Sequence, residues 1–533
     1  MVLEENNVLR TPLVRICGIA LMLAPRLVAA DEPVQLSLAE ATARALARNP
    51  EIAIERESVA LAEQVERRAE GAYDVQLQVD GRFRSRTDPL NNIFSGAPEG
   101  SLAPHINSLG STAAFSRLFT SGATAKASTG LSYDTTNGLF NLLSPAWYSS
   151  LGVDLRQPLA QGRRIDPARR ALRIASVDRQ RSVHALRRTV TETVAAVERV
   201  YWSLVAARRD VVVRRSAVAL AEQQRDDTQA QIEAGTAPES DLAQPVAEIE
   251  RRKGELFAAE EDAARAEHGL KTLMLGAPDD AWWDARLDPN EVPAVVPVAL
   301  EVRPAIDRAL AERPEIAEAI QLLSRQDIEI EAARDRTRPA VDLVASYALR
   351  GLAGTQNEDL TPPFPTPIVL PPDLDGAVGQ SYLNLIEHRF LDASVGVSVS
   401  VPLGNRTALA DLAAARIGRR QVSLGLDQLR QRIGAEVRNA IVSLQTARQR
   451  VDAARAGRAA AEVQLQAARD RFEAGTTILY FVLTRQNDLV QAVVTETAAL
   501  ADYQKALTEY ARAVGSLLAD RRIEVEPPAG DDR

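Results

Sequence analysis

The feature that most constrains the fold of this chain is a stretch that predicts one very long helix. After Asp166 and Pro167, no proline or glycine occurs from Ala168 to Glu233. At about 1.5 Å per residue, a helix of this length extends roughly 100 Å. An apolar residue recurs in it at every seventh position: Val183, Val190, Val197, Leu204, Val211 and Val218. Sustained heptads predict coiled-coil packing rather than a single globular core.

A second stretch later in the chain carries the same frame. Its seven-residue positions are Val437, Leu444, Val451, Leu465 and Phe472, with Arg458 as the one charged exception. A stripe of alanines lies three positions further on, at Ala440, Ala447, Ala454, Ala461 and Ala468. Because the distance between packed helices depends on the side chains at their contact, the stripe predicts a close helical neighbour.

The two long helices belong to a larger internal repeat. Three landmarks recur in the same order: ARALARNPEI at 43–52 and DRALAERPEI at 307–316, GVDLRQPL at 152–159 and GVSVSVPL at 396–403, IEAGT at 232–236 and FEAGT at 472–476. We interpret the chain as two copies of one unit of roughly 240–260 residues. Each copy is expected to hold short helices, strands, a long helix, a Gly-Thr turn and a returning helix.

Between the helical parts lie segments that predict strands. Residues alternate between apolar and polar at 75–84, 151–156, 341–350 and 395–401. A period of two with one polar side is typical of a half-buried strand. A further pair is expected at Thr112–Phe119 and Ala123–Asn137. The chain is therefore predicted to supply four or six strands.

These strands favour the wall of an outer-membrane β-barrel. Strands of about ten residues with an apolar outside, joined by long outer loops such as 88–109 and 351–392, are typical of such barrels. Four to six strands are fewer than the about eight needed to close a barrel, and an open edge is not viable in lipid. Several copies must therefore combine. A soluble β-sandwich with one wet face is the alternative.

The start of the chain reads as a signal peptide. Basic residues precede the apolar run 16–23, and small residues at Val28 and Ala30 suit cleavage. The alternative is a disordered cytosolic tail, and the acidic Glu4 leaves the true start codon open. Cys17 is the only cysteine, so the chain can form no intramolecular disulfide and no cysteine-only metal cluster.

Composition and motifs argue against several other functions. The net charge of −9 does not favour nucleic-acid binding. The four histidines are scattered, and no zinc-protease, phosphate-loop or nucleophile-elbow motif occurs. We predict no enzyme, no cofactor and no metal. No later stretch has about 20 uncharged apolar residues, so no transmembrane helix is predicted.

These patterns divide the chain into eight segments. They are a signal peptide (1–30), the short helices of the first copy (31–71), its barrel strands and outer loops (72–160), its long helical hairpin and linker (161–300), the short helices of the second copy (301–337), its strands and Pro-rich loop (338–404), its long hairpin (405–520) and a disordered tail (521–533).

The order of RNPEI, strand–RQPL–helix and EAGT–helix resembles the TolC-like outer-membrane efflux protein family, from about Leu36 to Leu518. The resemblance implies an α+β membrane protein. Three chains of a homotrimer would share one β-barrel in the Gram-negative outer membrane, continuous with a long periplasmic α-helical barrel. The implied partners are a periplasmic adaptor protein, an inner-membrane pump of RND or ABC type, and outer-membrane lipid, but no nucleic acid.

The resemblance also points to site residues at the Gly-Thr turns, which are the periplasmic tips in this family. The implied adaptor-binding residues are Gly235, Thr236, Asp241, Gly475 and Thr476. Family tips often carry an aspartate six residues after the glycine, where the first copy has Asp241 and the second has Phe481. The acidic ring of some relatives is therefore not visible. The aperture candidates are Tyr480, Phe481, Thr484, Arg485 and Asp488.

The function implied by the resemblance is that of a passive exit duct. Substrates would pass from the periplasm, or from the inner-membrane pump, to the exterior. A duct for type I secretion or for polysaccharide export has the same fold and stays open as an alternative. A soluble periplasmic coiled-coil scaffold with a β domain is the alternative from a different class of protein.

Overall fold

The structure is a computed structural model that describes residues 34–87, 96–99, 101, 103–361 and 369–526. Within these residues the chain forms two compact units. Unit 1 comprises the described residues of 1–63, 178–322 and 422–533, and unit 2 comprises those of 64–177 and 323–421. The predicted signal peptide, 1–30, lies outside the described residues.

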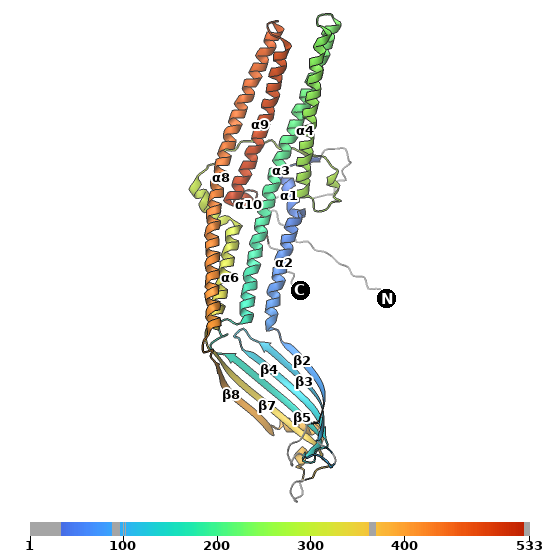
Figure 1. Ribbon diagram of the computed structural model, residues 1–533, viewed down its shortest axis with the longest axis vertical. Helices are drawn as coiled ribbons and strands as arrows, with labels where there is room; N and C mark the ends of the chain where they lie inside the picture. The colour runs from blue at the N-terminus through green and yellow to red at the C-terminus, as the bar shows by residue number, and fades with distance from the viewer. Residues whose placement is uncertain (1–33, 88–95, 100, 102, 362–368, 527–533) are drawn as a thin grey trace, which may run out of the picture. The chain divides into compact units, whose positions relative to one another are not determined.

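Unit 2 is built on one antiparallel sheet (Figure 1) with the strand order β2-β3-β4-β5-β7-β8. The described residues of this sheet form six strands rather than four, because both members of the further predicted pair are present. The strands are β2 (Gln76–Thr87), β3 (His105–Leu118), β4 (Thr124–Thr136), β5 (Leu143–Pro158), β7 (Ala340–Gln356) and β8 (Phe390–Ser400).

The register of the sheet sorts apolar and polar side chains onto opposite faces. One row across the six strands pairs Leu77, Phe115, Ala127, Val153, Tyr347 and Ala393. The next row pairs Gln78, Ala114, Ser128, Gly152, Ala348 and Asp392. Because successive residues of a strand point to opposite sides, these rows lie on what we call the apolar face and the polar face.

The two outer strands leave hydrogen-bonding edges open. Among the described residues, β2 pairs only with β3 and β8 pairs only with β7. Each strand is antiparallel to its neighbour, so in a sheet of six strands β2 and β8 run in opposite directions. The free edge of β2 in one copy can therefore form an antiparallel ladder with β8 of another.

The long helices predicted from the heptads are α3 (Pro167–Glu233) and α8 (Arg406–Glu473). Each turns back into a shorter helix, α4 (Ala243–Met274) or α9 (Leu479–Val514), as Figure 1 shows. The other helices are α1 (Leu38–Arg48), α2 (Pro50–Glu70), α5 (Val302–Glu312), α6 (Pro314–Arg336), α7 (Val378–Ile386) and α10 (Leu517–Asp520). The short strands β1 (Val34–Leu36) and β6 (Leu287–Pro289) pair in parallel. Four short 3₁₀ helices are also present in the described residues: η1 (Gly71–Tyr73), η2 (Glu239–Leu242), η3 (Ala281–Trp283) and η4 (Pro372–Leu374).

The heptad positions form much of the core of unit 1. Val190, Val197, Leu204 and Val211 of α3 are between 0 and 4% exposed. In α8, Ala447 of the alanine stripe packs in one buried cluster with Ala499, Tyr503 and Ala506 of α9, so α9 is the close neighbour that the stripe predicts. The exception in the α8 frame, Arg458, pairs with Glu462 and with Glu496 of α9.

Three segments differ from their sequence-based expectation. The outer loop expected at 88–109 ends earlier, because β3 already begins at His105. The segment 351–392, expected as an outer loop, contains the end of β7, the helix α7 and the start of β8. The tail expected to be disordered from 521 begins with packed residues: Arg521 forms an ion pair with the fully buried Glu198, and Ile523 and Val525 pack on a core cluster. These long-range contacts leave no periodic pattern in the sequence. Residues 527–533 of that tail lie outside the described residues.

Candidate functional site

The two predicted tips are built as the same turn, and both lie at the same end of unit 1 in Figure 1. Gly235 and Gly475 have φ of 70° and 67°, a left-handed conformation that glycine adopts without steric cost. In the first turn, the N–H of Gly235 donates to the carbonyl of Ile232 and that of Thr236 donates to Gln231, both at 2.9 Å. The second turn makes the equivalent bonds at the same distances. This pair of bonds is the Schellman motif, which satisfies the last carbonyls of a helix.

The threonine after each glycine strengthens the turn. The Oγ1 of Thr236 and that of Thr476 each donate to a carbonyl of the preceding helix at 2.9 Å. A Cβ placed on either glycine would meet nothing within 4 Å, so backbone conformation rather than packing requires glycine here. Asp241 lies in the exposed turn η2, where Ser240 Oγ donates to its carboxylate at 3.4 Å.

The aperture candidates lie in the first turns of α9. Tyr480 and Phe481 are 54% and 50% exposed, and their rings meet edge to face with centroids 5.7 Å apart. Thr484 Oγ1 donates to the carbonyl of Tyr480 at 2.8 Å, so this hydroxyl is used within the helix. The two aromatic rings therefore present an apolar surface at the start of α9.

The charged pair predicted near the tip is formed. Arg485 Nη1 lies 2.9 Å from Asp488 Oδ2, and the same nitrogen donates to Gln464 Oε1 of α8 at 3.0 Å. The pair is three residues apart on one helix face, where side chains reach each other. Arg485 therefore ties α9 to α8 close to the turn.

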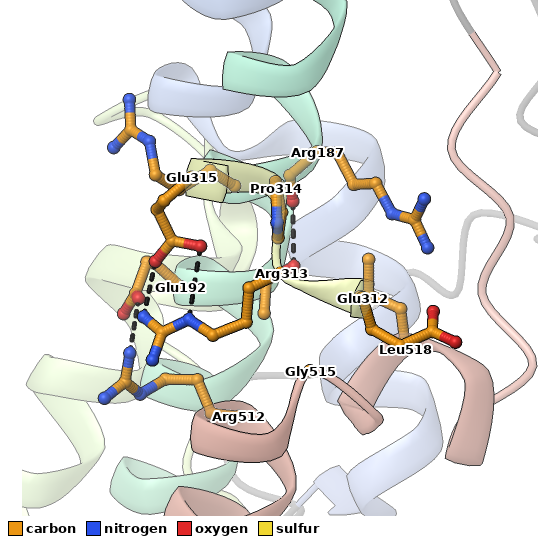
Figure 2. Close-up of a pocket in the computed structure, with 11 residues that line it drawn as sticks. Arg187, Glu192, Glu312, Arg313, Pro314, Glu315, Arg512, Gly515 and Leu518 are labelled. Carbon is orange, nitrogen blue, oxygen red and sulfur yellow. Dashed lines mark hydrogen bonds and ion pairs between the residues drawn. The ribbon is translucent and has the colours of Figure 1, made fainter. Parts of the chain in front are cut away.

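A charged network surrounds Arg512 near the end of α9 in unit 1, and no sequence pattern predicted it. Figure 2 shows part of it, including Arg512, Glu192, Arg313 and Glu315. The side chain of Arg512 is only 12% exposed and pairs with Glu192 of α3 at 2.8 Å, with Glu509 at 2.6 Å and with Glu436 of α8. Arg313, between α5 and α6, pairs with Glu436 at 2.7 Å and with Glu315. We call these six residues the Arg512 network: Glu192, Arg313, Glu315, Glu436, Glu509 and Arg512.

The local electrostatics keep this network charged. Burial alone would raise the pKa of Glu509, but hydrogen bonding to Arg512 and the charges of Arg512 and Arg199 hold that pKa below its ordinary value. Burial would likewise raise the pKa of Glu315, and Arg313 outweighs it, so this pKa is also lowered. The network therefore joins α3, α8 and α9 through ion pairs. One signal that could have drawn attention to it is the charged Arg313, which stands where the first copy has Asn49.

Among the residues that the structure describes, no group of three or more His, Cys, Asp or Glu side chains could hold a metal ion. Of the helices that the structure describes, none combines the length and apolar character needed to cross a membrane. The site thus consists of the two tips, the aperture candidates and the Arg512 network.

Solved structures share the fold of this chain. The CmeC outer membrane channel of Campylobacter jejuni matches with a TM-score of 0.60 and 14% identity over 90% of this chain and 86% of that one. The open state of the MtrE outer membrane channel of Neisseria gonorrhoeae matches with a TM-score of 0.58 and 15% identity over 90% and 89%. A membrane protein from Pseudomonas aeruginosa matches with a TM-score of 0.62 and 17% identity over 90% of each chain.

Sequence comparison adds the family. The family model described as outer membrane efflux protein matches residues 305–516. The outer membrane efflux protein BepC of Brucella suis biovar 1 (strain 1330) is 24% identical over 336 residues, which is 62% of this chain. Residues 305–516 belong to the outer membrane efflux protein family. The match spans 64% of BepC, less than two thirds of that relative's length.

The family match and the similar solved channels indicate an outer-membrane location with a periplasmic helical portion. Its mixed helix and strand content agrees with the predicted α+β class. The family and its solved channels are not enzymes. Adaptor binding at the tips and narrowing of the pore at the aperture candidates remain predictions.

Proposed function

We propose that three copies of this efflux protein form one channel that conducts substrates passively to the exterior. The sheets of unit 2 supply the barrel wall, and the helices of unit 1 supply the periplasmic tube. An adaptor protein binds the tips, and an inner-membrane pump of RND or ABC type supplies the energy. The protein itself performs no chemistry in this scheme.

The observation that carries the proposal is the open six-stranded sheet with one apolar face. Exposing the apolar face to water would cost a free energy of about 25 cal/mol for each Å² of apolar surface. Contact with lipid removes that cost. The unpaired edges of β2 and β8 are not viable in lipid. Three times six strands closes the wall with eighteen, a number that leaves a water-filled interior of the kind found at roughly 16–18 strands.

The polar face suits the inside of such a channel. Its charges pair across neighbouring strands: Arg156 lies 2.7 Å from Asp342, and Arg350 lies 3.2 Å from Asp392. Cross-strand pairs of opposite charge stabilise a sheet, and the exposed guanidinium groups remain hydrated. This face therefore offers water and polar solutes a lining without large apolar areas.

Electrophysiology tests the proposal directly. Purified protein reconstituted in planar bilayers is expected to show discrete conductance steps, and cross-linking in detergent is expected to trap a trimer. Absence of conductance in the native protein and in all tip variants would overturn the channel. A soluble periplasmic pool in cell fractionation would instead favour the scaffold alternative.

Neutralising the tip pair with Arg485→Ala and Asp488→Ala is expected to raise basal conductance. The double change removes both the ion pair and the bond from Arg485 to Gln464. A half-exposed tie of this kind is worth about 1 kcal/mol, which corresponds to roughly fivefold in the open population. Single-channel recording measures it.

The matched control for that experiment is the pair Asp427 and Arg430 on α8, which is also exposed and three residues apart. Alanine at both control positions is expected to leave conductance unchanged. If the tip variant also conducts like the native protein, Arg485 and Asp488 are not part of the gate.

Gly475→Val is expected to weaken adaptor binding. Its φ of 67° is left-handed, and a residue with a Cβ pays about 1–2 kcal/mol in that region, so the turn rearranges. Co-purification with the adaptor is expected to fall roughly tenfold. Gly475→Asn is the control, because asparagine tolerates this conformation. Full recovery with valine would place the docking surface away from this turn.

The nature of the cargo follows from the partners. Ducts for type I secretion and for polysaccharide export share this architecture. The fold therefore does not distinguish these cargoes, and the pump that works with the channel does. The genes beside this one identify the pump, and a proteomic pull-down on the native channel tests the assignment.

A further inference from the structure

The helix α7 of unit 2 lies against the apolar face of the sheet, where it contacts β5 and β7. The carbonyl oxygen and Oγ of Ser381 lie 3.0 and 2.9 Å from Oγ of Ser149. Ser149 pairs with Gly351 of β7, and a Cβ on Gly351 would lie 1.8 Å from the Ser381 carbonyl. Gly351 is two residues from Leu349, so it points to the apolar face. Glycine is therefore required for α7 to approach this closely.

The polarity of α7 is the reverse of that expected for a helix on a water-soluble sheet. On its inner side, Ser381 and Asn384 are 0% exposed, beside the apolar Leu385. Asn384 Nδ2 donates to the carbonyl oxygens of Leu352 at 2.8 Å and of Asp373 at 2.6 Å. The outward side is apolar: Tyr382, Leu383 and Ile386 are 37%, 52% and 65% exposed.

The inner polar groups complete the edge of the sheet. β8 begins at Phe390 opposite Arg350, whereas β7 continues to Gln356. The part of β7 beyond Arg350 therefore has no β8 partner, and unpaired backbone groups there must bond elsewhere. Asn384 donates to one such carbonyl, that of Leu352, and the N–H of Gly376 donates to the carbonyl of Gly354 at 3.0 Å. The polar side of α7 is thus buried because it bonds to the backbone of β7, and the apolar side chains of the helix face outward.

Aromatic residues mark the level of the sheet at which α7 lies. Tyr133 and Trp147 pair across β4 and β5 on the apolar face, with ring centroids 4.6 Å apart. Trp147 is two residues from Ser149, which contacts α7. Tyrosine and tryptophan gather where a bilayer meets water. The opposite ends of β5 and β8 lead into α3 and α8, so in the proposed channel, with these helices in the periplasm, this level lies in the outer leaflet.

We propose that α7 is an interfacial helix on the outer wall of the barrel, with Leu383 and Ile386 inserted among the acyl chains of the outer leaflet. The inference rests on the proposed function, since it requires the apolar face to contact lipid. Charged residues follow the helix directly: Arg389 pairs with Glu387 at 2.8 Å and with Asp373 at 2.5 Å. A helix with one apolar side and charges at its end is suited to the boundary between hydrocarbon and head groups.

Lipid fits this surface better than a second copy of the chain does. The outward side of α7 continues into exposed apolar residues of the same face, among them Tyr347, Leu391 and Val395. A bilayer covers such a continuous surface without a matched partner shape. A neighbouring chain that pairs with β8 meets its backbone edge in the plane of the sheet, whereas Leu383 and Ile386 lie on the helix side opposite Ser381.

Site-directed spin labelling distinguishes lipid, water and protein as the occupant. The chain has one cysteine, Cys17, so Cys17→Ser gives a background for single labels at Leu383 and Ile386. Val395 on the apolar face and Ser398 on the polar face are the matched controls. The collision rates of each label with oxygen, which enters lipid, and with a water-soluble nickel chelate are measured in proteoliposomes of channels that retain conductance.

Labels at Leu383 and Ile386 are expected to match Val395, with high oxygen and low nickel accessibility, and to differ severalfold from Ser398. High nickel accessibility at both positions would place α7 in water and overturn the inference. Low accessibility to both reagents would show a protein contact, such as a second copy, and would also overturn it. If Val395 itself is open to nickel, the membrane position of the whole face fails, and the proposed function fails with it.

Discussion

Val395→Arg is expected to prevent assembly of the channel in the outer membrane. Val395 lies on the apolar face of the edge strand β8, and its side chain is 79% exposed in the single chain. An arginine on the lipid face of a barrel costs about 2–4 kcal/mol near the middle of the bilayer. In the proposed trimer this cost arises three times. The measurement is the amount of trimer recovered from the outer-membrane fraction.

Ser398→Arg is the matched control, because Ser398 lies on the polar face of the same strand, opposite Asp342. An arginine there enters the water-filled interior next to a carboxylate, so trimer recovery is expected to remain near that of the native protein. Equal recovery of both variants would mean that the apolar face contacts neither lipid nor a packed interior.

Arg512→Met is expected to destabilise unit 1 more than any exposed charge substitution. The change leaves the carboxylates of Glu192, Glu436 and Glu509 without their shared cation. Breaking a buried ion pair costs roughly 3–5 kcal/mol. Glu192 is 44% exposed and the others are partly exposed, so water screens part of the loss, and about 2–3 kcal/mol is expected.

Thermal unfolding followed by circular dichroism measures this effect. Arg430→Met is the control, since its pair with Asp427 is exposed and lies within one helix, and it is expected to cost less than about 1 kcal/mol. If both variants unfold at the same temperature, the Arg512 network does not stabilise unit 1.

The loss in Arg512→Met is also expected to depend on pH. In the native protein the pKa of Glu509 is lowered below its ordinary value of 4.5, so its contribution is present above that value and is lost as pH falls through the folded pKa. Without Arg512, only Arg199 remains to offset burial, so the pKa of Glu509 is expected to lie higher than in the native protein, and protonation relieves part of the loss. The difference between variant and native protein is therefore expected to be largest near neutral pH and to shrink below about pH 5. A constant difference across that range would contradict this origin.

Local patterns were sufficient for most elements of this fold. A heptad pattern such as that of Val190, Val197 and Leu204 predicts which side of a helix is buried, because the helix period alone places these residues on one face. The tips were predictable residue by residue, since the bonds of the turn at Gly235 join residues at most five positions apart. The pair of Arg485 and Asp488 also lies within a single helical turn.

The remaining features join residues that are far apart in the chain. The Arg512 network brings together Glu192, Arg313 and Glu436 from three separate segments, and no periodicity relates such positions. The buried polar side of α7 exists only because β7 extends beyond β8 and leaves carbonyls to be paired.

The long helices, the alternating strands and the glycine turns follow from local sequence, because each depends on the conformations and bonds of neighbouring residues. Three features emerge only when distant segments pack together: six strands share one sheet, the polar groups of α7 face the apolar side of that sheet, and three carboxylates surround Arg512. Those outcomes depend on which buried donors and charges find partners once distant segments pack together, and a linear pattern does not contain that information.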